Sequence, residues 1–266
     1  MRSCLCTIGF QGKSRWDDDP VIEVPIDECL RRIKAWGFEG AEIWYRHVWK
    51  HSAEGLNQVL AQLETLGLGA PMISSYYDFT SSDESCEKSV LHAREVLVTA
   101  RRLKIPNIRI FSGPKGSKDV DEAGWDRAAK ALQMLCDEAG SIGLCLETHP
   151  RNLMDTVEGT RRLLNLVARP NLGLILQPST FVPDELAAIR SLGPFTRHVH
   201  ATNHCPGPDG RPVAVGLGEG EMDWKQILQI LAQGGFNGYV SLEWLAEGLD
   251  KAGPRAARFL RAHFPR

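Results

Sequence analysis

The chain repeats one pattern of apolar and polar positions from end to end. Apolar residues three and four positions apart are followed by a Gly or Pro break and then by a short apolar run. Leu132, Leu135 and Cys136, for example, share one helix face in the segment that ends at Gly140. Helix ends with positive φ are predicted at the glycines of these breaks, namely Gly37, Gly67, Gly140 and Gly234. Seven such units, the opening run CLCTIGF and a last helix over 252–263 predict eight strands alternating with helices.

This alternation predicts a parallel sheet covered by helices. The apolar runs are short and apolar on both faces, as expected of strands buried on both sides. Eight successive right-handed strand–helix–strand units close into a barrel, so the sequence predicts an α/β fold, a single (β/α)8 TIM barrel over residues 1–266 as one domain. A doubly wound open sheet is the competing fold, but FQGKSRW after the first run is a poor match to its glycine fingerprint.

The densest glycine run, GLGEGEMDW at 216–224, precedes a predicted helix. It is interpreted as a turn that leads into an Asp223 N-cap rather than as a phosphate-binding loop.

Composition excludes several function classes. The chain is 43% apolar and 24% charged with a formal charge of −2, which predicts no basic surface for nucleic acid or anionic membrane. Its N-terminal apolar stretch is too short for a signal peptide. Seven cysteines without a CxxC spacing predict buried free thiols in a cytoplasmic protein.

Four polar residues follow successive apolar runs in the second half of the chain: Glu147 in LCLETH, Gln177 in LGLILQPS, His200 in RHVHATN and Glu243 in GYVSLEW. In a parallel barrel these side chains converge at the C-terminal mouth, where reactive groups project. Two carboxylates, an amide oxygen and an imidazole suit Mn²⁺, Mg²⁺ or Co²⁺ better than Zn²⁺. The alternative for a single glutamate is a rim salt bridge, for instance between Glu243 and Arg109.

Such a site predicts proton transfer next to a carbonyl. The cation polarises a substrate carbonyl and stabilises an enediolate, while Glu147 and Glu243 act as general base and acid.

These residues resemble the xylose isomerase-like TIM-barrel superfamily, the sugar phosphate isomerase/epimerase proteins, over most of the chain. GFEGAEIW resembles the second strand of that family, with Glu42 at its acidic position. LCLETHPRNLMDT, RHVHATN and GYVSLEW resemble its fifth, seventh and last strands. The resemblance implies that Glu147, His200 and Glu243 are metal ligands and that Glu147 doubles as acid or base.

Two positions depart from the family pattern. Gln177 stands where the family usually has Asp, which keeps a ligating oxygen but removes a negative charge. Asn203 stands where an acidic residue commonly follows the metal histidine by three positions.

Further substrate contacts are predicted at His149, Glu42, Arg109, Asn203, Arg211 and Trp44. Several of these residues have a structural alternative. His149 is equally explained as a rim histidine held by Asp155, and Arg109 is better explained by a salt bridge to a barrel carboxylate. Arg211 lies in a loop typical of solvated segments. Trp44, like Trp16, sits where an aromatic ring can stack on a sugar.

The predicted function is a divalent-metal sugar isomerase or epimerase that acts on a ketose or related polyol. The runner-up is a dehydratase or lyase of a keto-cyclitol or keto-sugar, since both reactions remove an acidic C–H proton. A non-catalytic sugar-binding barrel and an apurinic endonuclease are weaker alternatives, the latter because the first four strands lack its histidine ligands. A small-molecule sugar is the expected partner, and loop aromatics are compatible with a homodimer.

Overall fold

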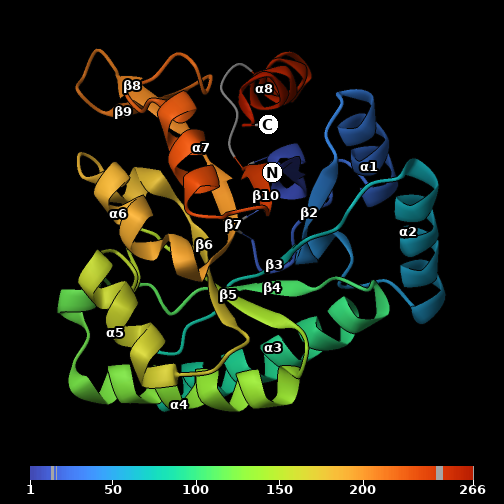
Figure 1. The fold of residues 1–266 in the computed structure, drawn as a ribbon. Helices are drawn as coiled ribbons and strands as arrows, with labels where there is room; N and C mark the ends of the chain where they lie inside the picture. Colours follow the sequence, from blue (N-terminus) through green and yellow to red (C-terminus); the bar gives the residue numbers. More distant parts are fainter. Residues whose placement is uncertain (13–14, 16, 244–247, 266) are drawn as a thin grey trace. The chain divides into compact units, whose positions relative to one another are not determined.

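The computed structural model describes residues 1–12, 15, 17–243 and 248–265. Its parallel strands form a closed barrel in the order β1-β10-β7-β6-β5-β4-β3-β2, which confirms the predicted (β/α)8 fold (Figure 1). The barrel strands are β1 (Arg2–Cys6), β2 (Gly40–Trp44), β3 (Ile73–Ser74), β4 (Asn107–Ile110), β5 (Gly143–Glu147), β6 (Leu172–Leu176), β7 (Thr196–Ala201) and β10 (Tyr239–Leu242). A separate antiparallel hairpin consists of β8 (Asn203–Pro206) and β9 (Pro212–Val215).

The helices alternate with the barrel strands, as the apolar pattern predicts. They are α1 (Ile26–Ala35), α2 (Ala53–Leu66), α3 (Asp83–Arg102), α4 (Glu122–Ala139), α5 (Val157–Val167), α6 (Glu185–Leu192), α7 (Trp224–Gln233) and α8 (Leu249–His263). Short 3-10 turns lie at Thr7–Phe10, Tyr45–His47, Ser117–Asp119, Pro178–Phe181 and Gly193–Phe195. Within the described residues, every helix is too short or too polar to span a bilayer.

The chain divides into two compact units, Met1–Pro71 with His198–Arg266 and Met72–Arg197. In the first unit β10 lies between β1 and β7, and β1 also pairs with β2. Ser241 of β10 is the partner of His200 in this register, and Glu42 of β2 is the partner of Cys6. The hairpin of β8 and β9, drawn in orange, belongs to the same unit (Figure 1).

In the second unit β3, β4, β5 and β6 pair in parallel. Arg109 is the partner of Cys145, and Glu147, the last residue of β5, is the partner of Ile175. Met72, Cys145 and Ile175 form a fully buried apolar cluster there. The register therefore places Arg109 and Glu147 on neighbouring strands, each beside an apolar cross-strand partner.

The residues at the ends of α7 and α2 explain where these helices begin and end. Asp223 caps α7 by accepting hydrogen bonds from the backbone N–H groups of Lys225 and Gln226, as the glycine-run interpretation predicted. Gly67 ends α2 with φ of 58°, a left-handed conformation that glycine adopts without strain. The same prediction is wrong at Gly234, which has φ of −75°, because the positive φ falls on Gly235.

All cysteine thiols except the half-buried Cys205 are buried. Burial raises the pKa of Cys29 to about 12, so this thiol is not a nucleophile at neutral pH.

Candidate metal centre

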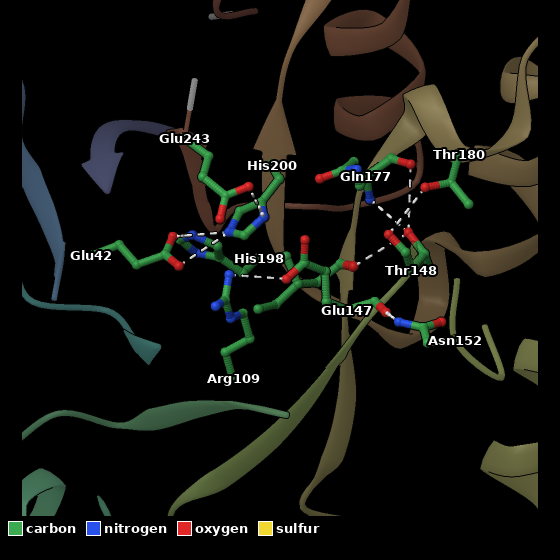
Figure 2. A network of polar contacts seen from close by, with 11 residues as sticks. Glu42, Arg109, Glu147, Thr148, Asn152, Gln177, Thr180, His198, His200 and Glu243 are labelled. Atoms are coloured by element: carbon green, nitrogen blue, oxygen red, sulfur yellow. Dashed lines mark hydrogen bonds and ion pairs between the residues drawn. The ribbon is translucent and has the colours of Figure 1, made fainter. Parts of the chain in front are cut away.

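In the first unit a buried carboxylate faces two imidazoles. Glu42 lies in the middle of β2, and His198 and His200 occupy alternate positions of β7, so their side chains share one face. One oxygen of Glu42, Oε2, lies 3.0 Å from Nε2 of His198 and 3.0 Å from Nε2 of His200. Figure 2 shows both rings directed at this carboxylate. From the sequence, a role is predicted for His200 and none for His198. The two histidines are two positions apart on one strand, and this spacing already indicated that both side chains lie on the same face.

Charge within this group favours the ionised carboxylate. Burial by itself raises the pKa of Glu42, but the electrostatic attraction and hydrogen bonds of His200 and His198 outweigh burial and lower the pKa well below its usual value. Glu42 is fully buried, so the predicted direct contact with substrate is not the role that its surroundings indicate.

Glu243 follows β10 directly and lies near the other nitrogen of His200. Its Oε2 is 3.8 Å from His200 Nδ1, and both side chains are buried (Figure 2). An oxygen and an imidazole nitrogen at this separation can bind the same divalent cation. The ligand atoms of Glu42, His198 and His200 also lie within 4.8 Å of one another. The first unit therefore holds buried Glu and His groups of a kind that fits a metal ion.

In the second unit Glu147 is paired with Arg109. Arg109 Nη1 lies 3.1 Å from Glu147 Oε2, and each side chain is only 1% exposed (Figure 2). The backbone oxygen of Glu147 accepts a hydrogen bond of 2.9 Å from Asn152 Nδ2, which fixes the strand end. The salt bridge expected between Arg109 and a barrel carboxylate is thus present, with Glu147 as the partner.

Gln177 follows β6 on a backbone that threonines hold in place. Its N–H donates to Thr148 Oγ1 at 2.8 Å, and its carbonyl accepts from the N–H of Thr180 at 3.1 Å. Thr180 Oγ1 in turn donates to the carbonyl of Thr148 at 3.1 Å. These contacts leave the Gln177 amide at the end of its strand, half-buried (Figure 2).

Two aromatic rings lie close to the guanidinium of Arg109. The guanidinium carbon lies 4.5 Å from the centroid of the Tyr76 ring and 5.4 Å from that of Phe111. Phe111 also contacts the ring of His149, with centroids 5.3 Å apart. Tyr76 is 37% exposed. Tyr76 and Phe111 were missed by sequence reasoning, since nothing in the spacing of SSYYD or RIF distinguishes a site ring from a packing ring.

The predicted substrate contacts of Trp44 and Arg211 stay predictions, and the structure places these residues in very different surroundings. Trp44 is 2% exposed and packs with Cys6 and Ile8 in a core cluster, so the expected ring stacking on a sugar finds no support. Arg211 lies in the hairpin turn, almost fully exposed and near Asp209. Trp16 lies outside the described residues.

Asn203 anchors a loop in the structure, while its predicted contact with substrate stays a prediction. Its Nδ2 donates to the carbonyls of Leu217 and Met222, and its Oδ1 accepts from the N–H groups of His204 and Met222. An amide side chain has two donor hydrogens and two acceptor sites, so these bonds use all of them. Asn203 therefore ties the hairpin to the glycine run.

The chain is similar to known proteins over most of its length. A family model described as "Xylose isomerase-like TIM barrel" matches residues 30–263. The chain is 27% identical to a 3-dehydroshikimate dehydratase of Bacillus anthracis, over 92% of this chain and 91% of that protein. It is 23% identical to a fructoselysine 3-epimerase of Shigella flexneri, over 83% of this chain and 85% of that protein.

Solved structures agree with the fold. A crystal structure of a probable 3-dehydroshikimate dehydratase from Bacillus anthracis superimposes with a TM-score of 0.84 at 26% identity, and the match covers 98% of this chain and 99% of that one. The similar proteins thus include enzymes named for dehydration and for epimerisation.

Proposed function

The chain belongs to the xylose isomerase-like TIM barrel family, and from that premise we propose that it is a divalent-metal enzyme that removes a proton from a carbon next to a carbonyl. The proposed outcome is loss of water from a hydroxylated cyclic ketone of the 3-dehydroshikimate type. The observation that carries this substrate choice is the 27% identity to a dehydratase along nearly the whole of both chains. Epimerisation, the leading expectation from sequence, becomes the second candidate.

The proposed ligands are Glu147, Gln177, His200 and Glu243. Each lies at or next to the C-terminal end of a barrel strand, which is where the barrel fold gathers reactive groups. Three oxygen donors with one imidazole suit Mn²⁺, Mg²⁺ or Co²⁺. When bound, the cation polarises the substrate carbonyl and makes the neighbouring C–H more acidic.

Glu147 is the proposed base. Its carboxylate is buried, and Arg109 compensates the charge while the Asn152 contact fixes the strand end. A carboxylate held in this way is ready to accept a proton without reorganisation. Glu243 is the proposed acid, because it lies beside His200 on the last barrel strand.

The proposed elimination balances without any further reactant. Glu147 takes the proton from the carbon next to the carbonyl, the electron pair of that C–H bond forms a carbon–carbon double bond, and the C–O bond at the neighbouring carbon breaks. Glu243 protonates the departing hydroxyl, which leaves as water. Return of the proton from Glu147 to Glu243 through solvent restores the enzyme.

The rings around Arg109 support a cyclic substrate. Tyr76 and Phe111 follow the ends of β3 and β4, and His149 follows β5. Elimination introduces a double bond and flattens a six-membered ring, and flat rings stack well on aromatic side chains. Tyr76, which is partly exposed and lies beside the buried guanidinium of Arg109, provides such a face.

Epimerisation uses the same two carboxylates in a different final step. Here Glu243 returns a proton to the opposite face of the same carbon, and the substrate mass does not change. The support for this second candidate is the 23% identity to fructoselysine 3-epimerase over 83% of the chain.

The deciding experiment incubates the Mn²⁺-loaded protein in D2O with 3-dehydroshikimate and, separately, with fructoselysine and D-psicose. Loss of one water from 3-dehydroshikimate supports the dehydratase. Unchanged mass apart from one incorporated deuterium in a ketose supports the epimerase. The variant Glu147→Gln is the control, and it should abolish whichever reaction is seen. Absence of both water loss and deuterium incorporation would contradict the proposal.

A further inference from the structure

One oxygen of Glu42 receives two imidazole nitrogens. Nε2 of His198 and Nε2 of His200 both lie 3.0 Å from Glu42 Oε2, and Nε2 of His200 lies 3.1 Å from Oε1. Glu42 and His200 are fully buried, and His198 is 1% exposed. These separations match N–H···O hydrogen bonds to a carboxylate.

The direction of these bonds sets the state of each ring. An ionised carboxylate only accepts hydrogen bonds, so both Nε2 atoms must carry the hydrogen. In a neutral imidazole with hydrogen on Nε2, the lone pair lies on Nδ1. In His200 that atom is the one 3.8 Å from Glu243 Oε2.

We propose that Glu42 is a positioning residue that holds His200 as the Nε2–H tautomer, so that Nδ1 binds the cation together with Glu243, and that His198 fixes the carboxylate through a second hydrogen bond to Oε2. This inference rests on the proposed metal function. It gives Glu42 a role in ordering a ligand rather than the substrate contact expected from sequence.

The same three residues also offer a competing metal site, in which they bind the cation themselves. Glu42, His198 and His200 offer ligand atoms within 4.8 Å of one another and could hold a cation themselves. His200 Nε2 cannot donate to Glu42 and bind a metal at the same time. The tautomer of His200 therefore separates the two arrangements.

The first test observes the tautomer directly. Protein labelled with ¹⁵N at histidine is measured by two-bond ¹H–¹⁵N correlation, both metal-free and loaded with diamagnetic Mg²⁺. The variants His198→Gln and His200→Gln assign the signals. We expect hydrogen on Nε2 of both rings in both states. Hydrogen on Nδ1 of His200 in the loaded protein would overturn the proposal, because it would place the metal at Nε2.

The second test measures cation affinity. Outer partners of ligating histidines typically change metal affinity by about 10–100-fold, so Glu42→Gln should weaken Mn²⁺ binding by about that factor. The matched control is Glu39→Gln, an exposed glutamate just before β2 that accepts hydrogen bonds from Ser3. It should leave Mn²⁺ affinity unchanged. An affinity within about twofold of wild type for Glu42→Gln would contradict the proposal.

The two proposals fail in different ways. The metal-free spectrum of the wild-type protein reports the tautomer without a cation, a substrate or a variant that must fold. If this spectrum and the affinity ratio agree with expectation while no substrate reacts, only the proposed reaction fails. If the reaction occurs while His200 carries its hydrogen on Nδ1, only the positioning role fails.

Discussion

Arg109 and Glu147 form an ion pair with 3.1 Å between Nη1 and Oε2, and each side chain is only 1% exposed. A charge this deeply buried is costly unless it is compensated, so each member of the pair depends on the other. Stacking of Tyr76 and Phe111 on the guanidinium adds a second reason for Arg109 to stay in place. The proposed base is therefore part of the folded core as well as of the site.

Replacing Arg109 by Met should destabilise the protein by about 3–5 kcal/mol, because it leaves the charge of Glu147 buried without its partner. Urea unfolding measures this change. The control is Arg94→Met on α3, whose partner Glu138 lies 2.7 Å away in a pair that is 44% and 36% exposed. A surface pair of this kind contributes at most about 1 kcal/mol. Equal losses for the two variants would contradict a special role for the buried pair.

Cation affinity should respond to the charge at position 177. Gln177→Asp adds a negative charge at the end of β6, and an affinity gain of about tenfold corresponds to only about 1.4 kcal/mol. Gln177→Ala removes the ligating oxygen and should weaken binding. Mn²⁺ titration of chelator-treated protein measures both variants. If neither differs from wild type, position 177 is not a ligand.

The barrel was predictable because its signals are local. Helix faces such as that of Leu132 and Leu135, and caps such as Asp223, depend on residues within a few positions. The hairpin of β8 and β9 was read as a loop because NHCPGPDGRP is rich in Pro and Gly. Its pairing of Asn203 with Val215 depends on tertiary anchors at Leu217 and Met222, which no local pattern reveals.

The sequence predicted that the candidate site residues lie at strand ends, but it did not predict which side chains contact one another. Glu147 ends β5 and Glu243 follows β10, as the apolar runs indicated. The contact of Glu42 with His198 joins residues 156 positions apart, and it exists only because β2 and β7 both border the β1–β10 pair. A one-residue change in register would turn either side chain to the other face.

Asn203→Ala should destabilise the protein by about 2–4 kcal/mol, because it leaves buried backbone groups at Leu217 and Met222 without partners. Thermal and urea unfolding measure the loss. The control Asn237→Ala removes an exposed contact to the N-terminus and should change stability by less than about 0.5 kcal/mol. A stable Asn203→Ala protein with weakened substrate binding would instead support the substrate contact predicted for this residue.

The pH dependence of stability should contain a component from His47. Burial lowers the pKa of His47 from its usual 6.5 to about 4, and its Nδ1 lies 2.9 Å from Thr7 Oγ1. Above pH 6.5 neither state is protonated there. As the pH falls from 6.5 towards 4, the unfolded chain binds the proton first and the folded state loses up to about 3 kcal/mol. Urea unfolding between pH 4 and 7 measures the free energy of unfolding, which should change less steeply with pH for His47→Gln than for the wild type. The same dependence on pH in both proteins would contradict this prediction.

Glu243→Gln should separate catalysis from stability. The amide keeps the size of the side chain and can still contact His200, but it cannot carry a proton between substrate and solvent. Product formation, measured as water loss from 3-dehydroshikimate or as deuterium incorporated into an epimerised ketose, should fall by at least about 100-fold, the usual minimum for loss of a general acid or base. Thermal stability should remain near that of wild type.

The control for this substitution is Glu219→Gln, an exposed glutamate of the same unit that pairs with Arg255. It should change neither product formation nor the midpoint of thermal unfolding, because exposed pairs contribute little to stability. If Glu243→Gln instead preserves product formation and unfolds at a much lower temperature, the carboxylate of Glu243 supports the architecture around His200. The proton must then be carried by a different group.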